Sequence, residues 1–210
     1  MASTPSELPP ITANSLSSKT WRVIPEILRR RAAYDPVMTG ECYALFLRGV
    51  NVGGIRIAMA DVAATLTDAG FTAVRTVLAS GNVVAESPAP VQSVRERAEA
   101  ALRDRFGYEA WVLAYPLATV ADIVAAYPFA PEVDGFHSYV TFVADPAVLE
   151  ELAALESPDE RIARGDGVLY WQVPKAATLD SAIGKTMGKA RYKASTTTRN
   201  LRTLNKVLAG

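Results

Sequence analysis

In the first half of the chain, the spacing of the hydrophobic positions alternates between one that is typical of strands and one that is typical of helices. The mostly apolar run at residues 42–48 is typical of a central strand that is covered on both faces. The next apolar positions recur on one helical face, at Met59, Val62, Leu66 and Ala69. Residues 73–78 and 83–86 flank Ser80-Gly81-Asn82, whose turn chemistry predicts two strands joined as a hairpin.

A longer helix and a fourth strand complete this half. The helix is predicted by a second apolar face, formed by Val91, Val94, Ala98, Ala101, Leu102 and Phe106. Gly107 ends it, and residues 109–115 predict the strand. The order strand, helix, strand, strand, helix, strand is the ferredoxin-like βαββαβ plan.

The second half has a similar but looser order of elements. Thr119 and Asp122 resemble a capping box and predict a helix from Thr119 to about residue 127, and Asp145 before Pro146 predicts the cap of another helix, to about residue 155. Gly165-Asp166-Gly167 predicts a hairpin turn between strands at residues 161–164 and 168–173. The other expected elements are a strand at 137–143, a helix from Asp180 or Ser181 to Gly188, and a final helix at about 198–208.

These patterns predict an α+β protein in three parts. Residues 1–37 are rich in Ser, Thr and Pro at their start, which predicts a disordered or weakly helical leader. Residues 38–127 are expected to form the ferredoxin-like subdomain, with the compact domain beginning at Met38. Residues 128–210 are expected to form a second, smaller α+β subdomain, and the shared order of elements raises the possibility of an internal duplication.

Composition narrows the class of protein further. Half of the 210 residues are hydrophobic, enough for a sizeable core, and no apolar run is long enough for a membrane span. One cysteine and one histidine fit a reducing compartment and disfavour a zinc site. We therefore expect a cytoplasmic protein with no membrane association, no metal and no cofactor, whose oligomeric state the sequence leaves open.

Charge is unevenly distributed although the net charge is zero. Residues 181–210 contain seven basic residues and no acidic one, whereas residues 38–180 contain ten basic and nineteen acidic residues. A basic end on an acidic body indicates either a tail that docks on that body or is solvated, or a site for an anion.

Three motifs resemble a known protein family. The segments ALFLRGVNVGG, ASGNVV and TTTRNLRTLNKVLA resemble the widespread, mainly bacterial family catalogued as domain of unknown function 1697, over residues 38–210. The resemblance implies a two-part α+β protein with a ferredoxin-like first part, and it implies no function. The residues that carry it best are Arg48, Gly49, Asn51, Gly53, Gly54, Ser80, Gly81, Asn82, Thr198, Arg199 and Asn200.

Candidate chemistry concentrates in a glycine loop and at the basic C-terminal end. Backbone N–H groups of the loop at residues 48–54 could hold an anion, although the spacing is neither GxGxxG nor a P-loop. The predicted final helix has leucines on one face and Arg199, Arg202 and Lys206 on another, which indicates a solvated helix or a phosphate contact. The candidate ligand-binding residues are Arg48, Asn51, Gly53, Gly54, Ser80, Asn82, Lys185, Arg199, Asn200 and Arg202.

Three functions remain open at this point. The first is binding of an anion (a phosphorylated metabolite, a nucleotide or a nucleic acid) in a cleft shared by the glycine loop and the basic helix, so that Arg48 and Arg199 approach each other. The second is an enzyme acting on a small anionic substrate, with catalytic residues unknown. The third is a structural or interaction module, in which Arg48, Asn51 and Asn82 would be hydrogen-bonded internally with no cavity beside them.

Overall fold

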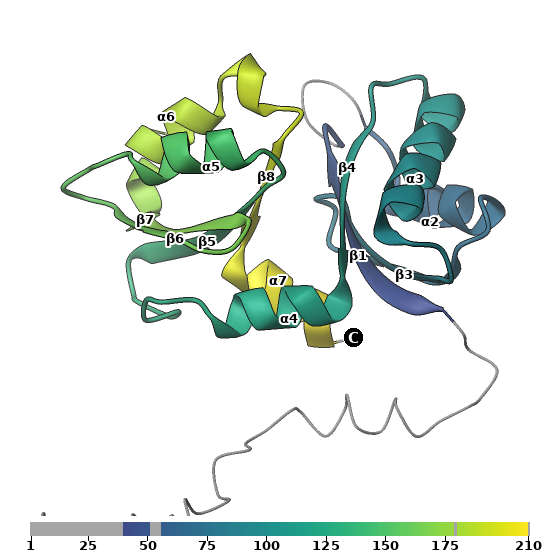
Figure 1. The fold of residues 1–210 in the computed structure, drawn as a ribbon, viewed down its shortest axis with the longest axis horizontal. Coiled ribbons are helices and arrows are strands. Elements are labelled where there is room, and N and C mark those ends of the chain that lie inside the picture. The colour runs from purple at the N-terminus through teal and green to yellow at the C-terminus, as the bar shows by residue number, and fades with distance from the viewer. Residues whose placement is uncertain (1–39, 51–55, 179, 210) are drawn as a thin grey trace, which may run out of the picture. The chain divides into compact units, whose positions relative to one another are not determined.

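The computed structural model describes residues 40–50, 56–178 and 180–209, and these residues form one compact unit. The fold is α+β, with two four-stranded antiparallel sheets (Figure 1). The predicted leader at residues 1–37 lies outside the described residues.

The first sheet has the ferredoxin-like topology that the sequence predicts. Its strand order is β2-β3-β1-β4, with each neighbouring pair antiparallel. Helices α2 and α3 cover one face of this sheet (Figure 1). The elements are β1 (Glu41–Arg48), α2 (Met59–Asp68), β2 (Thr72–Val77), β3 (Asn82–Ser87), α3 (Val91–Phe106) and β4 (Trp111–Pro116).

Strand β1 is apolar along most of its length because both of its faces are buried. Leu45 and Leu47 belong to the core beneath α2 and α3. Ala44 and Phe46, on the opposite face, belong to a second core that is shared with the other sheet. Side chains alternate along a strand, so Arg48 emerges on the same face as Ala44 and Phe46.

The second sheet repeats the topology of the first. Its strand order is β6-β7-β5-β8, and its chain order from β5 to β8 is again strand, helix, strand, strand, helix, strand. The elements are β5 (Phe136–Val143), α5 (Pro146–Ala153), β6 (Arg161–Arg164), β7 (Val168–Pro174), α6 (Ala182–Met187) and β8 (Thr196–Asn200), with 3₁₀ turns at Lys175–Ala177 and Ala190–Tyr192. The two halves therefore share one architecture, which extends the similarity in element order seen in the sequence.

Strand β8 corrects the prediction of one final helix from residue 198. Residues Thr196–Asn200 pair with β5, and the helix α7 (Leu201–Ala209) begins only after them. Three consecutive threonines are β-branched and favour a strand, and pairing with β5 outweighs the helical spacing of the leucines that follow. Arg199 is therefore a strand residue, and it does not lie in the first turn of a helix.

Helix α4 (Leu117–Ala125) corrects a second prediction. It begins two residues before Thr119, and no side chain caps its N-terminus, so Thr119 lies inside the helix and is not its cap. Pro116 precedes the first helical residue and holds an extended backbone there. Asp145, by contrast, caps α5 as predicted, because its carboxylate accepts a hydrogen bond from the Ala147 N–H.

A central core joins the two halves. Helices α4 and α7 pack on each other at one end of the space between the sheets (Figure 1). The inward faces of the two sheets meet in this core, where the ring centroids of Phe46 and Phe142 are 4.7 Å apart. The division of the chain at residues 127 and 128 stays a prediction. None of the helices in the described ranges is both long and apolar enough to span a bilayer.

Candidate functional site

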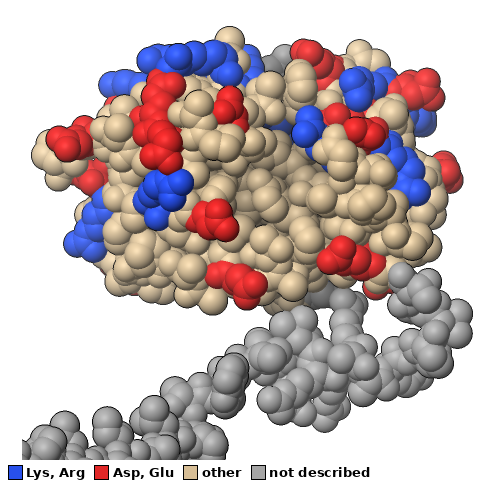
Figure 2. Space-filling model, viewed as in Figure 1, with Lys and Arg blue, Asp and Glu red and all other residues tan. Residues whose placement is uncertain are grey.

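A cleft of about 1100 Å³ opens between the two halves. Its walls come from the ends of β1 and β4, the β2–β3 turn, the α6 region and strand β8. Figure 2 shows charged residues of both signs over the face viewed in Figure 1, with a largely uncharged stretch across the middle. The lining residues with polar or aromatic side chains are Arg48, Ser80, Glu109, Trp111, Tyr139, Trp171, Thr178, Lys193, Thr196, Thr197, Thr198 and Arg199.

Arg199 lies at the base of this cleft and is only 9% exposed. Its side chain crosses from β8 to the first half, where its guanidinium lies 5.2 Å from the centre of the Phe46 ring. The guanidinium donates five hydrogen bonds, to Asn82 Oδ1 (2.5 Å), Thr197 Oγ1 (2.8 Å) and the carbonyl oxygens of Thr198 (2.8 Å), Leu47 (2.9 Å) and Gly81 (3.3 Å). An arginine has five N–H groups to donate, so these bonds use its full capacity.

All five acceptors of Arg199 are neutral, so no carboxylate balances its charge. Burial, together with the smaller effect of the nearby positive charge of Arg48, lowers the pKa of Arg199 to about 10. A buried cation next to a second cation is electrostatically unfavourable unless an anion is present. Among the described residues, no carboxylate forms an ion pair with Arg48 or Arg199, so two unpaired positive charges lie together at the base of the cleft.

Arg48 has a different set of partners. Its Nη1 donates to the backbone oxygen of Thr196 and lies 3.3 Å from the Thr196 hydroxyl. Within the described ranges, its Nε and Nη2 donate to no acceptor, so Arg48 keeps donors for a ligand whereas Arg199 has none left. Burial lowers the pKa of the Arg48 guanidinium, as expected for a cation held partly out of water.

Three aromatic residues line the cleft, and the sequence reasoning did not identify them. Tyr139 stacks on Trp171, with ring centroids 4.4 Å apart. The Trp171 indole donates to the Thr141 hydroxyl at 3.0 Å, and that hydroxyl lies 2.8 Å from the Thr198 hydroxyl. Trp111 pairs with Arg48 across β1 and β4. Its place in the predicted fourth strand was the available signal, but only the register shows that it lies beside Arg48.

The structure brings together some of the predicted site residues. Arg48, Ser80 and Arg199 line the same cleft, as expected if Arg48 and Arg199 approach each other. Asn82 is fully buried beneath it, where its amide donates to the Val77 carbonyl oxygen and the Ser80 hydroxyl. Asn51, Gly53 and Gly54 lie outside the described residues.

Other predicted residues do not line this cleft. Lys185 is exposed and lies 4.0 Å from the Asp180 carboxylate. Arg202 forms an exposed ion pair with Glu132, and Asn200 accepts a hydrogen bond from the Arg202 N–H. Asn200 and Arg202 border a separate, very small depression with His137. None of the described residues of α7 lines the cleft, so strand β8 takes the position that the basic helix was expected to occupy.

Comparison with known proteins agrees with the motifs and the fold. A family model described as "Protein of unknown function (DUF1697)" matches residues 41–170, which confirms the resemblance over that segment. A solved structure, that of the conserved bacterial protein SP0830 from Streptococcus pneumoniae, matches with a TM-score of 0.69 and 23% identity. The match covers 80% of this chain and 97% of the other, and at this identity it shows a common fold. No curated protein matched the chain.

Proposed function

Because the chain belongs to the DUF1697 family of proteins of unknown function, we propose its function from the cleft: it binds an anionic ligand between its two sheets. The observation that carries this proposal is the buried Arg199, whose acceptors are all neutral and whose neighbour is Arg48. An anion in the cleft would offset both positive charges.

Arg48 is the residue that would contact the anion directly. Its side chain has N–H groups without an acceptor in the described part of the chain, and a guanidinium can hold a phosphate or carboxylate through two parallel hydrogen bonds. Arg199 would act through its charge, since its N–H groups are already used. Lys193 and the hydroxyl of Ser80 line the same space and suit an oxyanion.

The structural alternative has support at Asn82, which is fully buried and hydrogen-bonded internally, and at Arg199. The five bonds of Arg199 tie β8 to the first half, which is what a residue that holds the halves together would do. That role predicts internal bonds with no cavity beside them, however, and a large cleft adjoins both arginines. For an enzyme, no hydrogen bond among the described residues joins a hydroxyl of the cleft to a carboxylate, imidazole or amine, so no observation favours that alternative.

The test compares two arginine substitutions that remove the same charge. Binding of inorganic phosphate and of ribose 5-phosphate is measured by calorimetry for the unaltered protein, Arg48→Gln and Arg202→Gln. A lost charge-assisted hydrogen bond is worth about 1.5–3 kcal/mol, so Arg48→Gln should weaken binding by roughly ten- to a hundredfold. Arg202→Gln, in its exposed pair with Glu132, should bind normally.

Salt and thermal stability provide the second measurement. Binding to an arginine pair should weaken as ionic strength rises, and saturating ligand should raise the midpoint of thermal unfolding. Equal losses in Arg48→Gln and Arg202→Gln would contradict a site at the cleft. Absence of any anion binding by the unaltered protein would refute the proposed function.

A further inference from the structure

We infer that the anion in this cleft carries a flat aromatic ring, as in a nucleoside phosphate, with the ring against Trp111 and the phosphate at Arg48. This inference rests on the proposed function and names the class of ligand for the same site. Three observations support it. They are the register of β1 and β4, the lack of a specific partner for the Trp111 indole among the described residues, and the carboxylate of Glu109 in a cleft whose other charged lining residues are cations.

The register places the indole of Trp111 beside the guanidinium of Arg48. The two residues are directly opposite in the antiparallel β1–β4 pair, so their side chains project from the same face of the sheet. That face is the one that bears Phe46 and looks toward the second half. A ligand that reaches Arg48 therefore passes within contact distance of an aromatic surface.

Trp111 is the cleft aromatic without a specific partner in the described part of the chain. Its side chain is half-buried, and no ring contact or hydrogen bond of the indole is present among those residues. Trp171, by contrast, is 2% exposed, stacks on Tyr139 and donates to Thr141. A large indole that faces a cleft, and whose N–H has no acceptor among the described residues, is suited to stacking on a ligand ring.

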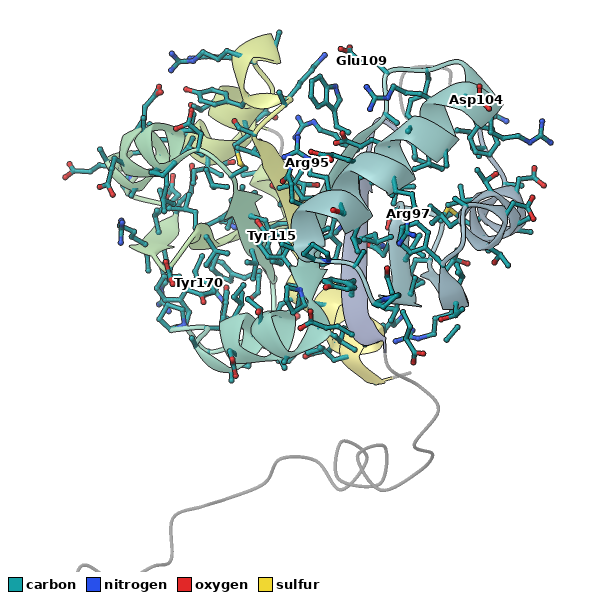
Figure 3. All side chains as sticks on the ribbon, turned by 45° about the vertical axis from the view of Figure 1, so that its right-hand side comes forward. Arg95, Arg97, Asp104, Glu109, Tyr115 and Tyr170 are labelled. Carbon is teal, nitrogen blue, oxygen red and sulfur yellow. The ribbon has the colours of Figure 1, made fainter. Side chains whose placement is uncertain are left out.

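Glu109 is suited to bind the part of the ligand that lies between the ring and the phosphate. It lines the cleft at the connection between α3 and β4, where Figure 3 labels it. Its carboxylate would repel a phosphate, so it suits a part of the ligand that donates hydrogen bonds. Ribose hydroxyls are such donors, and an acidic side chain is a common partner for them.

The edge of β8 that pairs with no other strand of the described residues supplies further polar groups on the second wall. Ala144 N–H donates to the Ser195 carbonyl oxygen, so Ser195, Thr197 and Arg199 direct their backbone groups toward β5. Thr196 and Thr198 therefore direct theirs outward, into the cleft that they line. Their N–H groups suit the phosphate or the edge of a base.

The experiment compares ligands that contain the aromatic ring alone, the phosphate alone, or both. The four nucleoside 5′-monophosphates, the corresponding nucleosides, ribose 5-phosphate and inorganic phosphate are titrated by calorimetry into the full chain. At least one monophosphate should bind roughly tenfold or more tightly than ribose 5-phosphate, because base stacking adds to the phosphate contact. The nucleosides should bind more weakly than their monophosphates.

Two substitutions at Trp111 isolate the ring contact. Trp111→Leu should reduce monophosphate affinity to the level of ribose 5-phosphate and leave ribose 5-phosphate binding unchanged. Trp111→Phe keeps a ring and should retain most of the affinity. Circular dichroism shows whether each variant is folded.

The outcomes separate this inference from the proposed function. Ribose 5-phosphate binding as tightly as the monophosphates, with no effect of Trp111→Leu, would overturn the aromatic ligand and leave anion binding standing. Binding of no phosphorylated compound would overturn both. A pentanucleotide that binds more tightly than the monophosphates, with the same dependence on Trp111, would support the ring and phosphate chemistry and assign its source to a single strand.

Discussion

Arg48 and Arg199 line one cleft, but their hydrogen bonds give them different roles. Arg199 donates all of its N–H groups to protein acceptors, and three of these belong to Leu47, Gly81 and Asn82 in the first half. Arg48 makes bonds through Nη1 only among the described residues. At the scale of single residues, Arg199 is thus a cation held by internal hydrogen bonds, and Arg48 is the residue that we propose to contact the anion.

We predict that Arg199→Ala destabilises the protein strongly. The change leaves buried oxygens on both halves without a donor, and each unsatisfied buried group costs about 1–3 kcal/mol. Several buried oxygens lose their donor at once, so we expect a decrease of roughly 3–5 kcal/mol in the free energy of unfolding. Urea denaturation measures it, with Arg202→Ala as the exposed arginine control. A near-normal stability of Arg199→Ala would show that the bonds across the halves contribute little.

At the scale of elements, the sequence predicted most of the first half because its signals are local. Apolar spacing, Gly107 after α3 and the turn signal Ser80-Gly81-Asn82 each act over a few residues, and the structure has the corresponding helix end and hairpin. Strand β8 was missed because its stability comes from pairing with β5, which lies more than fifty residues earlier. The β-branched threonines do favour a strand, but threonine is also a common helix N-cap, and the helical spacing of the leucines that follow led to one helix from residue 198.

The candidate site was also predictable only where its residues belong to local motifs. Arg48, Ser80 and Arg199 were identified from motif residues that line the cleft. Lys185 and Arg202 were included because they are basic and near the C-terminus, and charge along the sequence does not show which face a side chain occupies. Trp111 required the β1–β4 register, which is a long-range property of the sheet.

The β2–β3 turn gives the second prediction, at Gly81. This residue has φ +73°, and a Cβ placed there would lie 3.0 Å from the Leu47 carbonyl oxygen, a backbone atom that cannot easily move. Gly81→Ala should therefore lower the free energy of unfolding by about 1–2 kcal/mol for the left-handed backbone and by a further 1–3 kcal/mol for the close contact.

Gly107→Ala provides the matched control for Gly81→Ala. Gly107 has φ +63°, but a Cβ there would have nothing within 4 Å, so only the backbone cost applies. Chemical denaturation of the two variants should show the larger loss for Gly81→Ala. Equal losses would mean that β1 and the turn can separate without cost, and the position of Ser80 at the cleft would then not depend on this contact.

At the scale of the whole molecule, two halves of equal topology share a core as well as a cleft. Phe46 and Phe142 meet between the sheets, and α4 and α7 close one end of that space. The arginine pair lies where the apolar inner faces end, since Arg48 follows Phe46 on the same face of β1. The packing that joins the halves therefore also fixes the two walls of the site relative to each other.

This arrangement predicts that the two halves unfold together. Trp111 reports on the first sheet and Trp171 on the second. The double variant Trp21→Phe/Trp171→Phe keeps only Trp111, and Trp21→Phe/Trp111→Phe keeps only Trp171. In each variant, the fluorescence midpoint in urea should coincide with the circular dichroism midpoint. Adding Phe142→Ala should shift both reporters by the same amount, with a loss of about 3–5 kcal/mol. Separate transitions, or a shift confined to Trp171, would show that each half is stable alone and that the cleft can open without unfolding either wall.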